Sequence, residues 1–182
     1  MRNEPTAMEA LLTRRSVRAF TEEPVQEADI RAIVRAGMHA PSAHNRRAWQ
    51  MLTVTDRATL DVLAPMNRWW GMLKEATLCV VTLSYSPGIK PEDEEFLVQD
   101  GAAATENMLL AIHALGLGGV WLGVHPQRPY YKDIKALLNI PAEVRVVSLI
   151  AAGRPQQPQP PRAAPWERFE EEKWHKERYM SK

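Results

Sequence analysis

The spacing of apolar residues along the chain predicts a protein in which helices alternate with strands. In residues 26–39, Ile30, Ile33 and Val34 recur three or four positions apart, a spacing typical of one helix face. Residues 76–85, ATLCVVTLSY, are almost continuously apolar, which indicates a buried strand. The same reading predicts further helices over 57–64, 91–116 and 130–138, and further strands over 49–56, 118–124 and 144–153.

This order of elements places the chain in the α+β class. Because helices separate the strands, we expect a three-layer α-β-α sandwich, with a central mixed sheet flanked by helices. The length of 182 residues suits a single domain covering residues 1–182. The chain carries 23 Lys and Arg against 22 Asp and Glu, a formal net charge of +1. That balance argues against a protein built mainly to bind nucleic acid.

The sequence also predicts where several helices begin. Thr6 and Glu9 form a T-x-x-E capping box ahead of the first apolar positions, and Asp56 can cap a later helix. Pro91 and the four acidic residues after it mark the start of the longest helix. Within that helix, residues 101–104 are Gly-Ala-Ala-Ala, which would let another backbone come close.

The last segment of the chain is rich in proline and then in aromatic residues. The stretch GRPQQPQPPRAAP predicts extended backbone. The aromatic side chains beyond it are costly to leave in water: Trp166, Phe169, Trp174 and Tyr179. We therefore expect residues 154–182 to form an extended arm that packs on a partner subunit. A frayed tail is the alternative interpretation.

Cysteine content and hydropathy indicate the compartment. The single cysteine, Cys79, excludes an intrachain disulfide and fits a reducing, intracellular setting. The N-terminus has no apolar signal core, and no stretch approaches the ~18 uncharged apolar residues that a membrane helix needs. We therefore expect a soluble, cytoplasmic protein with no membrane partner.

The first candidate site is RRSVR, where Arg14, Arg15 and Arg18 crowd around Ser16. Guanidinium groups and a hydroxyl can all donate to phosphate oxygens, so the cluster could hold a phosphate. The alternative is a solvated helix end, where the dipole favours cations. If the first helix continued through the cluster, Arg14 and Arg18 would share one face.

The other two candidate segments are a loop and a glycine-rich strand. In HAPSAHNRRAW, Pro41 blocks helix continuation and Asn45 offers both a donor and an acceptor, so the loop could present polar groups to a flat ligand. Trp49, which ends the loop, fits the core better than a ligand site. In ALGLGGVWLGV, Gly123 marks a place where a ligand could approach the backbone. The glycine spacing is not that of a G-x-G-x-x-G loop.

Taken in order, these segments resemble the nitroreductase family of flavin enzymes. RRSVR comes first and APSAHNRRAW second, and a long helix of small residues then ends in ALGLGGVWLGV. The final strand ends in GRP, and the tail RFEEEKWHKERY is similar to the C-terminal arm of the short members. The resemblance spans residues 8–179 and implies a homodimer with two FMN molecules at its interface.

The resemblance also implies a role for each site residue. The RRSVR segment, Gly153 and Arg154 would hold the FMN phosphate. The loop around Asn45 would reach the flavin from the other subunit, and the strand ending at Gly123 would place a backbone N–H near flavin N5. The residues implied in cofactor binding are Arg14, Arg15, Ser16, Arg18, His39, Pro41, Ser42, Ala43, Asn45, Arg47, Trp121, Leu122, Gly123, Gly153 and Arg154.

The chain departs from the family pattern at Arg47-Ala48, where many members have Gln-Pro. Arg47 could donate to the flavin edge or point at a substrate phosphate or carboxylate, and both roles stay open. His44 lies beside the predicted pocket, whereas His113 lies inside the long helix and is expected to pack there. No cluster of His, Cys, Asp or Glu has metal-ligand spacing.

The implied reaction is a two-step hydride transfer through FMN. NADH or NADPH would reduce the flavin, and an electron-poor small molecule such as a nitroaromatic or quinone would then accept the electrons. No acid–base side chain is required, so we assign no catalytic residue. The alternatives are a specialised flavin enzyme of the same fold, such as a reductive dehalogenase or flavin-destroying oxygenase, and a protein that binds flavin without turnover. The sequence chooses neither between NADH and NADPH nor among acceptors.

Overall fold

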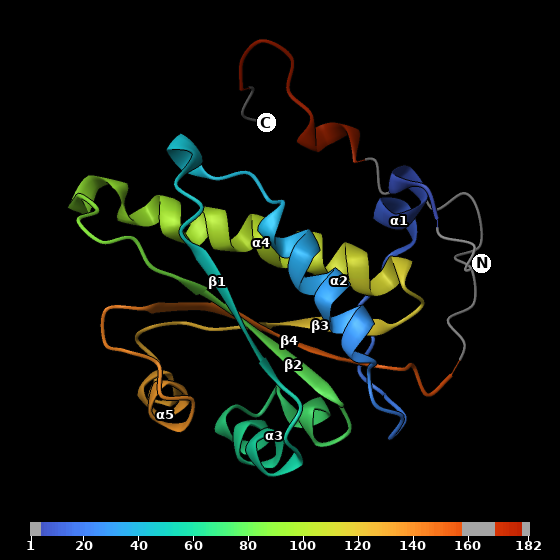
Figure 1. The fold of residues 1–182 in the computed structure, drawn as a ribbon. Coiled ribbons are helices and arrows are strands. Elements are labelled where there is room, and N and C mark those ends of the chain that lie inside the picture. Colours follow the sequence, from blue (N-terminus) through green and yellow to red (C-terminus); the bar gives the residue numbers. More distant parts are fainter. Residues whose placement is uncertain (1–4, 158–169, 180–182) are drawn as a thin grey trace.

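The computed structural model of the chain describes residues 5–157 and 170–179, and its elements follow the predicted order (Figure 1). The helices are α1 (Ala7–Thr13), α2 (Glu27–Met38), α3 (Arg57–Leu63), α4 (Glu94–Ala114) and α5 (Tyr130–Leu137). The strands are β1 (Trp49–Val54), β2 (Leu78–Ser84), β3 (Gly118–Gly123) and β4 (Arg145–Gly153). Each helix and strand predicted from residue 26 onward is present and differs from the prediction only at its ends, where helices commonly fray.

The four strands form one sheet in the order β1-β2-β4-β3, and every neighbouring pair is antiparallel. The expectation of a mixed sheet is wrong in this respect. Since β2 and β3 run in the same direction and β4 inserts between them, β4 is antiparallel to both. The one parallel pairing among the described residues is an isolated bridge between Ser16 and Gly119.

Helices cover both faces of the sheet, which confirms the α+β class and the three layers (Figure 1). Successive residues of a strand point to opposite faces. Val80 and Ile150 therefore pack with residues of α2 and α4, whereas Val81 and Leu149 pack with residues of α3 and α5. All seven residues of β2 are buried, as its continuous apolar run predicts.

Helix α4 lies close to the sheet because small and hydroxyl side chains face the strands. A Cβ added at Gly101 would lie 2.8 Å from Val147 Cγ2. The buried Thr105 hydroxyl donates to the Gly101 carbonyl (2.7 Å) and lies 3.0 Å from the Thr82 hydroxyl and 2.8 Å from the Ser148 hydroxyl. Because its only hydrogen is used within the helix, Thr105 accepts from both strands. These bonds fix α4 over β2 and β4.

The two predicted helix caps form. Thr6 N–H donates to Glu9 Oε2 (2.7 Å) and Glu9 N–H donates to Thr6 Oγ1 (3.3 Å), which completes the capping box of α1. The Asp56 carboxylate accepts the backbone N–H of Thr59 (2.8 Å) at the start of α3. Each cap satisfies a backbone donor that the helix itself cannot pair.

The only cysteine of the chain, Cys79, is fully buried in β2. Burial raises the pKa of its thiol to about 12. Because the thiolate is the reactive form of cysteine, this thiol is chemically inert while the protein stays folded.

The predicted arm, residues 154–182, is described only in part. Trp166 and Phe169 lie outside the described residues, whereas Trp174 and Tyr179 are exposed. The packing of the arm on a partner subunit therefore stays a prediction. Within residues 5–157 and 170–179, no helix is long and apolar enough to cross a membrane.

Two glycines of β3 offer a matched test of how the strand is packed. A Cβ at Gly118 would lie 2.7 Å from Cγ1 and 2.8 Å from Cβ of Val17, a stiff β-branched side chain. We expect Gly118→Ala to lower the free energy of unfolding by about 1–3 kcal/mol. A Cβ at Gly123 meets no atom within 4 Å. Gly123→Ala should therefore change stability by less than about 0.5 kcal/mol. Urea denaturation of both variants measures the difference, and equal stabilities would contradict the packing described.

Candidate functional site

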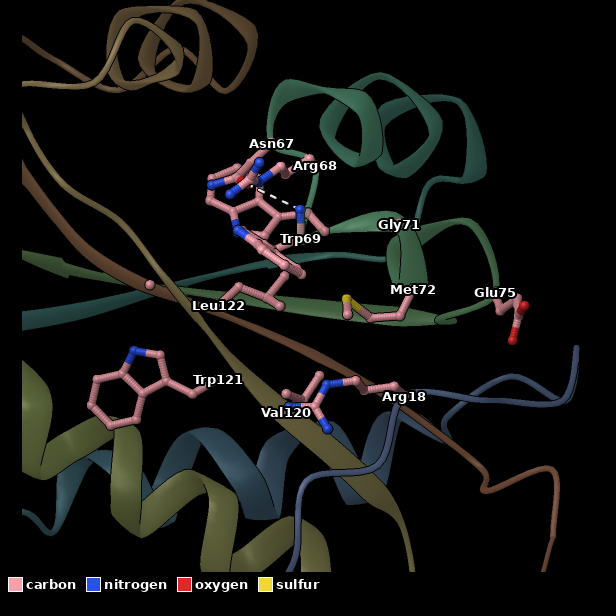
Figure 2. Close-up of a pocket in the computed structure, with 12 residues that line it drawn as sticks. Arg18, Asn67, Arg68, Trp69, Gly71, Met72, Glu75, Val120, Trp121 and Leu122 are labelled. Atoms are coloured by element: carbon pink, nitrogen blue, oxygen red, sulfur yellow. Dashed lines mark hydrogen bonds between the residues drawn. The ribbon is translucent and has the colours of Figure 1, made fainter.

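A cavity of about 880 Å³ opens between β3 and the loop that follows α3 (Figure 2). One wall is β3 from Val120 to Gly123, together with Arg18. The facing wall is formed by residues 67–72 and Glu75. The cavity thus joins four of the residues that the sequence implicated: Arg18, Trp121, Leu122 and Gly123.

Strand β3 gives the cavity an apolar wall with open space beside the backbone. Val120 and Leu122 are buried in the core between the sheet and helices α3 and α5. Trp121, on the other face of the strand, remains 36% exposed. No atom lies within 4 Å of the point where a Cβ of Gly123 would be, so a planar group could approach the backbone there.

The arginine cluster is a short extended segment beside β3, and not the end of a helix. Helix α1 stops before Arg14, whose backbone is extended (φ −54°, ψ 137°). Ser16 forms a bridge with Gly119, and Val17 N–H donates to the Gly119 carbonyl (3.0 Å). Because side chains alternate in extended backbone, Val17 is buried while Ser16 and Arg18 are exposed. A shared helix face for Arg14 and Arg18 is therefore wrong.

Acidic residues balance part of the positive charge of the arginine segment and of the neighbouring Arg154. Arg14 Nε lies 3.3 Å from Glu106 Oε1 on α4. Arg154 Nε lies 2.5 Å from Glu23 Oε1. Both pairs are partly exposed, so each contributes at most about 1 kcal/mol to folding. Their main effect is to hold two arginine side chains near the start of β3.

His113 on α4 contacts the same segment. Its Nε2 lies 2.8 Å from the Thr13 hydroxyl, which donates to the Glu9 carbonyl (2.5 Å). Because the Thr13 hydroxyl has one hydrogen, His113 Nε2 must be the donor. Burial, and then the charges of Arg14 and Arg15, lower the pKa of His113. Its neutral form is therefore favoured, and it packs in the helix as the sequence predicts.

Gly153 and Arg154 lie beside the end of the same segment. A Cβ at Gly153 would lie 3.2 Å from three side-chain atoms of Phe20, so within this chain the glycine makes room for that ring. The Arg154 carbonyl accepts Thr21 N–H (2.9 Å). A contact of either residue with a phosphate stays a prediction.

The loop between α2 and β1 has an unusual backbone. His44, Asn45 and Arg47 all have positive φ, at 53°, 53° and 52°. Each such residue other than glycine costs of order 1–3 kcal/mol unless the surroundings hold it in place, and such residues concentrate at binding sites. The loop also contains Pro41, Ser42 and Ala43 of the predicted site, and it leads into the buried Trp49, which belongs to the core.

Helix α4 holds this loop in place. The buried Asp100 accepts the backbone N–H of Ala43 (2.9 Å). Arg46 donates to Asp93 (2.5 Å), and this hydrogen bond is the main reason why the pKa of Asp93 is lowered. The strained backbone is thus fixed by two carboxylates from the N-terminal half of the helix and the turn before it.

Arg47 points back into its own loop. Its backbone N–H donates to Ser42 Oγ (2.9 Å) and its Nε donates to Asn45 Oδ1 (3.0 Å). Arginine can only donate, so the amide oxygen of Asn45 must face Arg47 and the amide nitrogen must face away. The loop therefore presents hydrogen-bond donors. The two ligand roles considered for Arg47 stay predictions.

The loop and the cavity lie at opposite edges of the sheet. The loop leads into β1 and the cavity follows β3, with β2 and β4 between them. At roughly 4.8 Å between neighbouring strands, β1 and β3 lie about 14 Å apart. His39 is exposed at the end of α2, beside Arg35, and does not line the cavity. One chain therefore does not bring the two halves of the predicted site together.

The sequence interpretation missed the second wall of the cavity. Trp70 is buried, and its ring centroid lies 4.9 Å from that of Tyr130. Trp69, its neighbour, is 68% exposed, and Asn67 and Glu75 also line the cavity. Adjacent tryptophans in a polar loop were the available signal, since one tryptophan anchors the loop and the other faces the solvent.

The cavity suits a flat ligand that carries negative charge. Its surface combines apolar and aromatic side chains with Arg18 and Arg68, against the single carboxylate of Glu75. Such a mixture of apolar walls and a few polar groups is typical of cofactor sites. Among the described residues, no group of three or more His, Cys, Asp or Glu could hold a metal ion.

Comparison with known proteins identifies the family. The model of the Nitroreductase family matches residues 11–71 and 64–154. A protein of Archaeoglobus fulgidus assigned as an NADH dehydrogenase/NAD(P)H nitroreductase is 34% identical over 172 residues, which cover 94% of this chain and 98% of the relative.

Two solved structures share the fold. A protein of Clostridium acetobutylicum assigned as an NADH oxidase has 32% identity and a TM-score of 0.84, covering 93% of this chain and 99% of the other. A protein of Desulfovibrio desulfuricans assigned as a nitroreductase, solved in complex with FMN, has 30% identity and a TM-score of 0.76, covering 98% and 100%. With its sheet order, its cavity along β3 and these matches, the chain belongs to the nitroreductase family.

Proposed function

We propose that the protein is an FMN-dependent oxidoreductase that uses NADH or NADPH to reduce an electron-poor small molecule, such as a nitroaromatic or a quinone. Family membership and the FMN-bound relative support this proposal. The observation that carries it is a single cavity lined both by the open backbone at Gly123 and by Arg18 of the arginine cluster.

The residues fit both parts of FMN. Arg14, Ser16 and Arg18 offer two guanidinium groups and a hydroxyl near the start of β3, which suits a phosphate. Leu122 and Gly123 line the cavity, and the free space beside the Gly123 backbone suits a planar ring. Strand β3 runs from the arginine segment to Gly123, and it therefore spans the distance between the residues that suit the phosphate and those that suit the ring.

The chain contributes binding and orientation to the reaction. Bound FMN would supply the redox chemistry that links oxidation of the nicotinamide to reduction of the acceptor. The arginines anchor the phosphate through charge-assisted hydrogen bonds of ~1.5–3 kcal/mol each. Among the described residues, Glu75 is the only carboxylate that lines the cavity, and it accepts a long hydrogen bond from Phe20 N–H (3.4 Å). We assign no catalytic acid or base.

A second copy of the chain would complete the site. The loop around Asn45 lies at the β1 edge of the sheet, away from β3 in the same chain, and this separation supports a role for the loop at a partner subunit's site. Helix α1 exposes apolar side chains that such a partner would cover, with Met8 62% and Leu11 53% exposed. We propose a homodimer in which residues 154–182 form an arm on the partner. A cytoplasmic location is proposed from the lone buried thiol of Cys79.

The first test is the wild-type protein itself. We expect the purified chain to bind FMN and, in the absence of oxygen, to oxidise more than one equivalent of NADH or NADPH per flavin only when a quinone or nitroaromatic acceptor is present. Flavin absorbance measures FMN binding, and the loss of nicotinamide absorbance measures the oxidation of NADH or NADPH. FMN binding without acceptor-dependent oxidation would reduce the proposal to a flavin-binding protein.

Arg14→Ala tests the phosphate site. We expect FMN affinity to fall about ten- to hundredfold, because one charge-assisted contact of ~1.5–3 kcal/mol is lost. Glu106→Gln is the matched control, since it breaks the Arg14–Glu106 ion pair but keeps the guanidinium. Titration of the flavin-free proteins with FMN measures both. An equal loss in the two variants would mean that the ion pair, and not a phosphate contact, explains the effect.

Asn45→Asp tests the donor role of the loop and the shared site together. The new carboxylate can still accept from Arg47 Nε, and Asp tolerates positive φ, so the loop should keep its structure. The outward donor becomes an acceptor, so we expect FMN affinity to fall about tenfold or more.

A mixed dimer then shows whether two chains share each site. Arg14→Ala and Asn45→Asp chains with different tags can be co-expressed, and the dimer that carries both tags can be purified. If each site uses Arg14 of one chain and Asn45 of the other, one of its two sites is fully wild type. We expect half of the sites to bind FMN with wild-type affinity. Weak binding at both sites would place both residues in the same chain's site.

A further inference from the structure

We propose that Arg68 and Trp69 form a rim subsite that selects flat aromatic acceptors carrying a negative charge, such as a carboxylate. The proposal rests on the proposed function, because it assigns a substrate class to the same cavity. Both residues line that cavity, on the wall that faces β3 (Figure 2).

The turn that presents the rim is rigid. The Asn67 side-chain oxygen accepts Trp69 N–H (3.0 Å) and its carbonyl accepts Trp70 N–H (2.9 Å). Trp70 is 1% exposed and packs on Tyr130, so it anchors the turn in the core. With the backbone fixed on both sides, Trp69 is held outward with 68% of its surface exposed. The indole of Trp69 therefore remains accessible from the cavity that it lines.

Trp69 in turn positions Arg68. The Arg68 Cζ lies 4.7 Å from the centroid of the indole, within the range of a cation–π interaction. Arg14, Arg46 and Arg154 each pair with a carboxylate. Among the described residues, no ion pair or side-chain hydrogen bond joins the Arg68 guanidinium. Its N–H groups therefore remain available to an anion, in a side chain that stacking has already ordered.

The residues around the rim indicate what is attached to the anion that Arg68 would bind. In Figure 2, Trp69 lies on the same side of β3 as the partly buried Met72, so apolar surface for a flat ring adjoins the guanidinium. Arg18 adds a second positive charge, against Glu75 alone. An aromatic ring with an attached anion matches this pattern of apolar surface and charge. The phosphates of NADPH share the anionic part of this chemistry, so the experiment must separate them.

The test compares two acceptors of similar size that differ in charge, 4-nitrobenzoate and 4-nitrobenzyl alcohol. In the FMN-loaded Arg68→Ala protein, we expect kcat/KM to fall about tenfold or more for the carboxylate and less than about twofold for the alcohol. For the carboxylate, kcat/KM of Arg68→Lys should lie between the values of the wild type and of Arg68→Ala, because lysine keeps the charge but lacks the planar fork. Arg128→Ala, an exposed arginine outside the cavity, is the control and should leave both values unchanged.

Three results would overturn the proposal. Equal losses for both acceptors would remove the charge selectivity. A changed preference for NADPH over NADH with an unchanged acceptor ratio would assign the rim to the electron donor. If the wild type reduces neither acceptor, calorimetric titration of the protein with 4-nitrobenzoate tests the rim alone, whereas the proposed function is tested separately with a quinone. The wild type should then bind it about tenfold more tightly than Arg68→Ala, and equal binding would refute the subsite.

Discussion

The position of helix α4 on the sheet is the constraint on which both halves of the site, the strained loop and the arginine segment, depend. Thr105 donates within its own helix and accepts from Thr82 and Ser148 on two strands, so neither sliding nor rotation of α4 leaves these buried hydroxyls satisfied. One part of the helix then carries Asp100 to the strained loop, and a later part carries Glu106 to the arginine segment. The buried hydrogen bonds of Thr105 therefore set the positions of the strained loop and of the arginine segment, which lie at opposite edges of the sheet.

Local chemistry explains how much of the fold could be predicted. The capping box at Thr6, the cap at Asp56 and the continuous apolar run of β2 act over a few residues, so the sequence alone reveals them. The pairing of strands is different, because β4 is the last of the described strands and inserts between two earlier ones. The extended form of the arginine segment also depends on a contact between distant parts of the chain, since Gly119 on the edge of β3 is the bridge partner of Ser16.

The candidate site was predictable where a motif marks it and not where tertiary contacts build it. The order of RRSVR, the loop after α2 and the glycine-rich strand pointed to Arg18 and Gly123, which do line one cavity. The wall around Trp69 has no periodicity, and only the burial of Trp70 shows which way its neighbour faces. The inward turn of Arg47 accompanies positive φ at three residues of its loop, a property that composition does not encode.

The burial of Cys79 makes the natural chain a ready background for site-specific labelling. With a thiol pKa of about 12 and no exposed surface, this cysteine should not react with maleimide reagents in the folded protein. A cysteine introduced at an exposed position such as Val62 on α3 would be the only thiol to take up a spin label or a dye. Distances between two labelled copies could then be measured by spectroscopy without first removing a native residue from the sheet.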